Sequence, residues 1–214
     1  MSKNNQPQTP ENRRMDSDIE RRAFDDGVEV RASGDGKNKL TGYALKWGVR
    51  YNMGWFTEEI SREALKDSDM SDVRALLNHD PNMVLGRTKS GTLKLEQDGV
   101  GLRYEIDLPD TQAARDLSVS IQRGDISQSS WGFTLRVDDS DNGDEWKREN
   151  GKDHRVIKRV GRVFDVSPVT FPANPDTSVA KRSLDHFSKA DENEEKLNQR
   201  GLQLKATLAL YPNT

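Results

Sequence analysis

The segment Gly124–Phe133 places two adjacent serines on opposite faces of a predicted β-strand. Side chains alternate between the two faces of a strand, and the apolar residues from this point onward share one parity. They are expected to form a face turned to a core: Trp131, Phe133, Leu135 and Val137. Ser129 shares that face, whereas Ser130 and Gly132 fall on the other. Ser130 is therefore held away from the core, beside a glycine that lets another backbone come close. This placement suits a nucleophile, although many strand serines are ordinary polar residues.

Composition separates the middle of the chain from its ends. The length of 214 residues suits one domain plus tails, while a mean hydropathy of −0.92 is low for a fully folded chain. Residues 1–20 are polar and contain proline, so we predict a disordered N-terminal tail. The folded domain is expected over residues 21–180. Residues 181–214 form a charged tail whose spaced leucines predict a partly helical segment.

Several functional classes are disfavoured by composition. The net charge of −3 gives no case for nucleic-acid binding. The absence of cysteine excludes disulfides and thiolate metal sites. No apolar run is long enough to cross a bilayer, and the N-terminus lacks the apolar stretch of a signal peptide. We therefore expect a soluble intracellular protein with no membrane partner, no metal and no cofactor.

Alternating apolar residues predict a mainly β fold with flanking helices (α+β). We expect a strongly curved sheet or a β-barrel, with a few helices packed outside. A hairpin is predicted over residues 92–108. One helix is expected to begin at Thr57, with Ile60, Ala64 and Leu65 on one face. A second is expected to begin at Asp110 or Thr111 and to end before Gly124.

A serine nucleophile needs a base, and the chain contains three histidines. His186 lies in the charged tail, and His154 lies in a polar segment that we interpret as a solvated hairpin loop. His79 directly follows an apolar strand, where its side chain can enter a cleft. The alternative is an ordinary turn histidine between Asn78 and Asp80.

Asp165 interrupts an otherwise apolar run. If it is buried, its carboxylate must be paired, because an unpaired buried charge is costly. A salt bridge with Arg159 or Arg162 would satisfy it. Alternatively, it accepts the Nδ1 hydrogen of His79 and leaves Nε2 facing Ser130. Spacing alone does not decide between these two.

Taken in order, three segments resemble the caudovirus prohead serine proteases, which are related in fold to the herpesvirus assemblins. The resemblance covers about residues 21–180 and rests first on these motifs: Leu76–Pro81 with Val84–Thr88, Gly124–Ser127 with Ser130–Phe133, and Asp165–Ala173. Further segments follow the family pattern: Gly42–Ala44, Trp55–Glu58 and Gly91–Leu108. The fold implied is an assemblin-like sheet or barrel.

The resemblance implies a catalytic triad of Ser130, His79 and Asp165. Two positions depart from the usual pattern: an aspartate stands where glutamate is more common, and Gln128–Ser129 replace a glycine and a bulkier apolar residue. The second departure makes Ser129 a rival nucleophile, but strand parity selects Ser130. Backbone N–H groups after Asp165 or near Arg87 are expected to stabilise the oxyanion.

The implied function is a serine endopeptidase acting in the host cytoplasm, inside an assembling prohead. Its expected substrates are the scaffolding protein, a scaffold-like segment of the major capsid protein, and the protease itself. Relation to the assemblins implies a homodimer. Two alternatives stay open. One is a catalytically inactive assembly protein with the same fold, and the other is a metal-dependent hydrolase using His79 and Asp80, for which ligands are scarce.

Overall fold

The computed structural model describes residues 19–24, 29–32, 38–138 and 142–171, with isolated positions between 183 and 200. The chain divides into two units, Met1–Pro175 and Asp176–Thr214. The described positions of the second unit are helical, but the tail segment predicted from its leucines lies outside the described residues, as does most of the N-terminal tail. The domain boundaries at 21 and 180 stay a prediction. Among the described residues, no helix has both the length and the apolar character needed to cross a bilayer.

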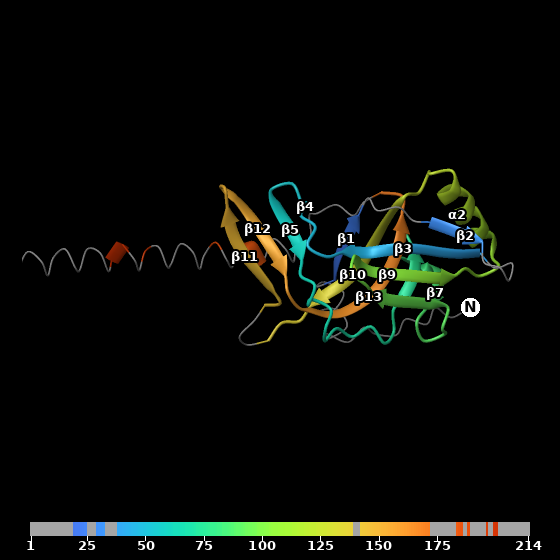
Figure 1. Ribbon diagram of the computed structural model, residues 1–214, viewed down its shortest axis with the longest axis horizontal. Helices are drawn as coiled ribbons and strands as arrows, with labels where there is room; N and C mark the ends of the chain where they lie inside the picture. The colour runs from blue at the N-terminus through green and yellow to red at the C-terminus, as the bar shows by residue number, and fades with distance from the viewer. Residues whose placement is uncertain are drawn as a thin grey trace, which may run out of the picture. The chain divides into compact units, whose positions relative to one another are not determined.

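The described part of the first unit is mostly strand, arranged in sheets (Figure 1). The five-stranded sheet has the order β1 (Glu20–Phe24), β10 (Gln128–Leu135), β13 (Val160–Val169), β6 (Arg74–Leu77) and β7 (Asp80–Arg87). A second has the order β11 (Asp144–Glu149), β12 (Lys152–Ile157), β5 (Phe56–Ile60) and β4 (Tyr51–Asn52). A third has the order β2 (Glu29–Ala32), β3 (Asn38–Lys46), β9 (Gly101–Asp107) and β8 (Leu93–Gln97).

The mainly β class with few helices is confirmed. Within the described ranges none of the sheets closes on itself, so the barrel alternative is wrong. An assemblin-like arrangement stays a prediction. Figure 1 shows β11, β12 and β5 gathered at one end of this unit and α2 (Gln112–Gln122) beside β2 at the other.

Helix α2 begins and ends at the residues that its sequence signals predict. Thr111 is the N-cap, and its side chain accepts a hydrogen bond from the backbone N–H of Ala114. Its apolar face packs into the core through Ala114, Leu117 and Ile121. Gly124 follows the helix with φ 82°, in the left-handed region that favours glycine after a helix end. The turn from Gly124 leads directly into β10.

The helix predicted from Thr57 does not exist; residues 56–60 form the strand β5. Phe56, Glu58 and Ile60 are buried in alternation, and β5 pairs in parallel with β12. Turns follow instead of a helix, and they still bring Ala64 and Leu65 into the core. The helical spacing of those apolar residues arises from a strand followed by turns.

The polar segment predicted as a solvated loop contains the β11–β12 hairpin. Asn150 and Gly151, with φ 52° and 77°, make the turn between the strands. His154 is buried on β12, where its Nδ1 lies 2.8 Å from the Thr57 hydroxyl oxygen. Sequence alone suggested exposure because the segment, which ends at His154, is rich in charge. The charged residue that follows it, Arg155, is also buried.

A buried ionic cluster joins β1 to the second sheet. Arg155 donates to both carboxylate oxygens of Glu20, at 2.7 and 2.8 Å, and to Glu58 at 2.9 Å. Arg22 donates to Glu58 at 2.8 Å and also to Glu20. Asp144 accepts from Arg155 at 2.7 Å. Charges removed from water this completely persist only because each one is paired. The cluster therefore holds the N-terminal strand against the rest of the domain.

This cluster predicts a specific loss of stability in acid. Burial alone would raise the pKa of Glu20, but the charges and hydrogen bonds of Arg155 and Arg22 lower it from 4.5 to about 2. A carboxyl group with a lowered folded-state pKa stabilises the protein fully above its unfolded pKa. That stability is lost as pH falls from about 4.5 towards 2. The free energy of unfolding should decline more steeply in this window for the wild type than for Glu20→Gln. Equal slopes would contradict the assignment.

Candidate active site

Strand β10 holds the two serines on opposite faces, as parity predicts. Ser129 is fully buried on the core side, with its hydroxyl oxygen 3.0 Å from the Tyr104 hydroxyl. Burial raises the pKa of Tyr104 to about 12, which keeps that phenol neutral. Trp131 and Phe133 stack on the same side. The extension of this apolar face to Val137 is wrong, because β10 ends at Leu135 after two register shifts and Val137 is exposed.

His79 lies in the tight turn that joins β6 to β7. Asn78 and His79 have φ 55° and 58°, the pattern of a two-residue type I′ hairpin turn. The turn is tied to the end of β13, because the Asn78 N–H donates to Pro168 and its side chain oxygen accepts the Thr170 N–H at 2.8 Å. A histidine at positive φ is strained, and the tie to β13 holds it there. The turn prediction and the functional prediction for His79 are thus compatible.

The structure brings the three residues predicted for the site together. His79 Nε2 lies 2.7 Å from Ser130 Oγ, and its Nδ1 lies 2.6 Å from Asp165 Oδ1. With the carboxylate ionised, Nδ1 carries the proton and donates to Asp165, which leaves Nε2 to accept from the serine hydroxyl. The alternative salt bridges for Asp165 are wrong, because Arg159 pairs with Asp138 and Arg162 with Asp69.

Antiparallel pairing of β10 with β13 sets Asp165 beside Gly132. The two residues are register partners, and a Cβ built on Gly132 would lie 2.5 Å from Asp165 Oδ2. The sequence predicted that another backbone segment would pack closely against this glycine. In the structure, the group that packs there is the side-chain carboxylate of Asp165. Ser130 is likewise the register partner of Ser167, whose hydroxyl donates to Asp165 Oδ1 at 2.7 Å. Sequence reasoning missed Ser167, although its position two residues after Asp165 puts both on one strand face.

If the three residues act as the predicted triad, Gly132→Ala should lower the rate of cleavage about a hundredfold without unfolding the domain, because the new methyl group displaces the Asp165 carboxylate. The measurement is kcat for cleavage, with circular dichroism to verify folding. Gly99→Ala is the matched control, since a Cβ at Gly99 meets no atom within 4 Å. Unchanged kcat in Gly132→Ala would contradict the role of the glycine.

Access to the Ser130 hydroxyl is restricted in this conformation. Ser130 has 0% of its surface exposed, and Ala23 of the edge strand β1 is its register partner on the side away from β13. The His79 side chain is 12% exposed and that of Asp165 8%. Any molecule that is to contact Ser130 Oγ therefore needs part of this cover to move.

The other candidate groups predicted from the sequence lie apart from Ser130, His79 and Asp165. Asp80 accepts hydrogen bonds from the backbone and side-chain nitrogens of Asn82, at 2.8 and 2.9 Å. Within the described ranges, no cluster of three or more histidines or carboxylates could hold a metal ion. Arg87 stands in a bidentate pair with Asp72, at 2.6 and 2.8 Å, and is the register partner of Arg74 at the end of the hairpin opposite the His79 turn. His186 lies outside the described residues.

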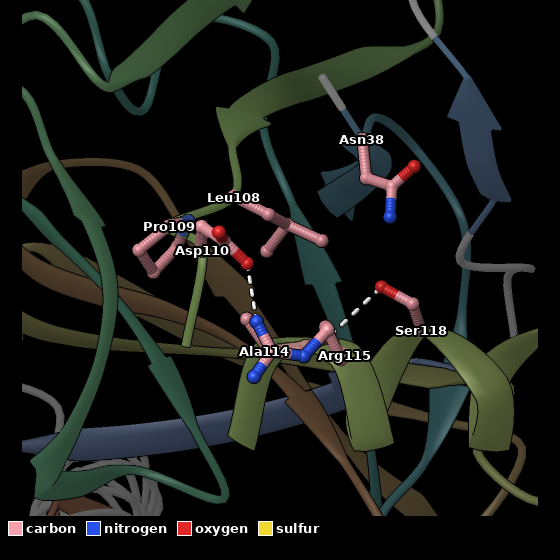
Figure 2. A pocket seen from close by; sticks show the side chains of 7 residues that line it. All are labelled: Asn38, Leu108, Pro109, Asp110, Ala114, Arg115 and Ser118. Atoms are coloured by element: carbon pink, nitrogen blue, oxygen red, sulfur yellow. Dashed lines mark hydrogen bonds and ion pairs between the residues drawn. The ribbon is translucent and has the colours of Figure 1, made fainter. Parts of the chain in front are cut away.

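A cavity of about 320 Å³ opens at the N-terminal end of α2 (Figure 2). Its lining residues come from α2 and the segments before it: Asn38, Leu108, Pro109, Asp110, Ala114, Arg115 and Ser118. Two of its polar side chains contact other lining residues, since Arg115 contacts Asp110 and the Ser118 hydroxyl donates to the Ala114 carbonyl. None of Ser130, His79 and Asp165 lines the cavity.

Comparisons with known proteins give one family match and a similar solved structure. The family described as Caudovirus prohead serine protease matches residues 26–190, which is more than half of the chain. Among solved structures, the capsid assembly protease gp21 of bacteriophage T4 is similar with a TM-score of 0.42 at 10% identity, covering 71% of this chain and 96% of that one. No curated protein matches the sequence. With a family match that spans Ser130, His79 and Asp165, this chain belongs to the caudovirus prohead serine protease family.

Proposed function

We propose that this protein is a serine endopeptidase whose nucleophile is Ser130, whose general base is His79 and whose orienting carboxylate is Asp165. The observation that carries the proposal is the continuous hydrogen-bond chain from Ser130 Oγ through the imidazole to Asp165 Oδ1, with contacts of 2.7 and 2.6 Å. These lengths are those of a nucleophile–base pair with an oriented base.

The arrangement supports acyl transfer in two steps. Ser130 Oγ attacks the scissile carbonyl carbon while His79 Nε2 takes its proton, and the imidazolium formed is stabilised by the Asp165 carboxylate. The same proton then passes to the leaving amine, and the peptide C–N bond breaks to leave an acyl-enzyme. A water molecule, activated by His79 in turn, hydrolyses the ester and restores Ser130.

An aspartate at position 165 is long enough for its role. Its carboxylate reaches His79 Nδ1 because β13 runs directly beside β10 and the absent side chain of Gly132 leaves room. The shorter side chain was the main reason to consider an inactive assembly protein. Since Asp165 makes the contact that an orienting carboxylate needs, the aspartate is not a reason to favour that alternative.

The substrates that we propose follow from the family and not from a binding groove. A prohead protease acts where capsid proteins assemble, so we infer cleavage of the scaffolding protein or of a scaffold-like segment of the major capsid protein. Cleavage of the enzyme itself is a further part of the proposal. The site of action would be the interior of the prohead in the host cytoplasm, and self-association of the protease is proposed by analogy with the assemblins.

The proposal is tested by co-expressing the chain with the scaffolding and major capsid proteins of the same phage. New protein termini are mapped by mass spectrometry, and the same experiment with Ser130→Ala identifies those that depend on the nucleophile. Defined cleavage products in the wild type alone support the proposal. An identical set of termini in both experiments, or no new termini, would overturn it.

A further inference from the structure

We propose that Ser167 is a positioning residue for the triad: its hydroxyl holds the Asp165 carboxylate in the orientation in which that carboxylate receives the Nδ1 hydrogen of His79. The inference rests on the proposed function and extends it to a residue that does not touch the substrate. Its structural basis is a second donor on the same carboxylate oxygen that binds the imidazole.

The contacts assign the direction of each hydrogen bond. Ser167 Oγ lies 2.7 Å from Asp165 Oδ1 and 3.4 Å from His79 Nδ1. An ionised carboxylate only accepts, so the serine hydroxyl donates to it. His79 Nδ1 lies 2.6 Å from that same oxygen. Asp165 Oδ1 thus receives two donors, and the shorter of the two contacts of Ser167 is the one with the carboxylate.

The second carboxylate oxygen is confined by packing. Asp165 Oδ2 lies above Gly132, where even a methyl group would come within 2.5 Å. Ser167 is fully buried, and Asp165 is nearly so. One oxygen is therefore held by hydrogen bonds and the other by the backbone of β10. Removing the contact with His79 would change a triad residue, and altering Gly132 would add atoms to the site. The Ser167 hydroxyl is therefore the restraint that can be deleted by itself.

Strand geometry explains why this position is available. Asp165 and Ser167 are two residues apart on β13, so their side chains stand on one face of the sheet. Their register partners on β10 are Gly132 and Ser130. These residues form two cross-strand pairs on one face of the sheet, Ser130 with Ser167 and Gly132 with Asp165. His79 contacts Ser130 and Asp165 of these pairs from the β6–β7 turn.

Loss of the hydroxyl frees the carboxylate to rotate and leaves the imidazole less strictly oriented. We expect Ser167→Ala to lower kcat about ten- to a hundredfold, with KM unchanged because Ser167 does not contact substrate. Ser167→Thr, which restores a hydroxyl, should recover part of the lost activity. Ser129→Ala is the matched control, since it deletes an equally buried hydroxyl from the neighbouring strand that bonds Tyr104 instead. That variant should keep its kcat.

A double-mutant cycle separates positioning from general packing. If Ser167 acts through the carboxylate, Ser167→Ala should have little further effect on kcat in an Asp165→Asn background. Additive losses in the two variants would overturn the proposal. So would an equal loss of kcat in Ser129→Ala, or a wild-type kcat in Ser167→Ala.

A spectroscopic readout keeps this inference separate from the proposed function. The proton between His79 Nδ1 and Asp165 should give a downfield ¹H resonance in the NMR spectrum, assigned by its loss in His79→Gln. In Ser167→Ala this resonance should move or broaden, whereas in Ser129→Ala it should stay in place. An unchanged resonance in Ser167→Ala would overturn the positioning role even if the protein is a protease. Failure of the proposed function itself would show instead as cleavage that survives Ser130→Ala.

Discussion

Ser130→Ala is expected to abolish proteolysis, with a loss of at least about 10⁴-fold in kcat. The substitution removes the only atom of the site that would form a bond to the substrate, and His79 Nε2 then has no hydroxyl at 2.7 Å to deprotonate. The measurement is the initial rate at which capsid or scaffolding substrate disappears, with equal amounts of folded enzyme verified by circular dichroism. Because Ala23 lies opposite this position on β1, the smaller side chain should leave the sheet intact.

Ser129→Ala supplies the matched comparison. Its hydroxyl bonds the buried Tyr104 phenol at 3.0 Å on the core face, so its loss should cost about 1–3 kcal/mol of stability. Cleavage per folded molecule should stay near the wild-type rate. If Ser129→Ala alone were inactive while Ser130→Ala still cleaved, the assignment of the nucleophile by strand face would be wrong.

Arg155→Ala is expected to give the largest loss of stability, about 3–5 kcal/mol in the free energy of unfolding. Arg155 is fully buried and bonds Glu20, Glu58 and Asp144 at 2.7 to 2.9 Å. Without Arg155, these carboxylates lose a neighbouring positive charge and several hydrogen bonds, and water cannot replace them in this buried region. Urea denaturation followed by circular dichroism measures the change. Since Glu20 belongs to β1, unfolding should begin by release of that strand from β10.

Arg148→Ala is the control for this prediction. Arg148 lies on β11, is 58% exposed and pairs with Asp153 at 3.1 Å. An ion pair in contact with solvent contributes little, so its loss should change the free energy of unfolding by less than about 1 kcal/mol. Equal effects of the two substitutions would show that the buried cluster does not hold β1 in place.

Local patterns predicted much of the fold. The signals for α2 all lie within or next to that one helix, and the structure confirms each of them. They are the N-cap Thr111, the apolar face and the glycine that follows the helix, Gly124. The helix expected from Thr57 was wrong because its apolar spacing fits equally a strand that ends in turns. Pairing of β5 with β12 and burial of Glu58 decided between the two. Such pairing is a tertiary contact that no local pattern reports.

The sequence by itself determined which face of β10 each serine occupies, because alternation along a strand is a local property of the backbone. It also carried the ordered motifs by which the family is identified. Only the tertiary structure decided that His79 meets Ser130 and Asp165, from which it is separated by 51 and 86 positions. It likewise decided that Asp165 lies above Gly132 beside Ser167, and that Arg155 is buried. These contacts depend on the register between strands, which is set by packing across the whole domain.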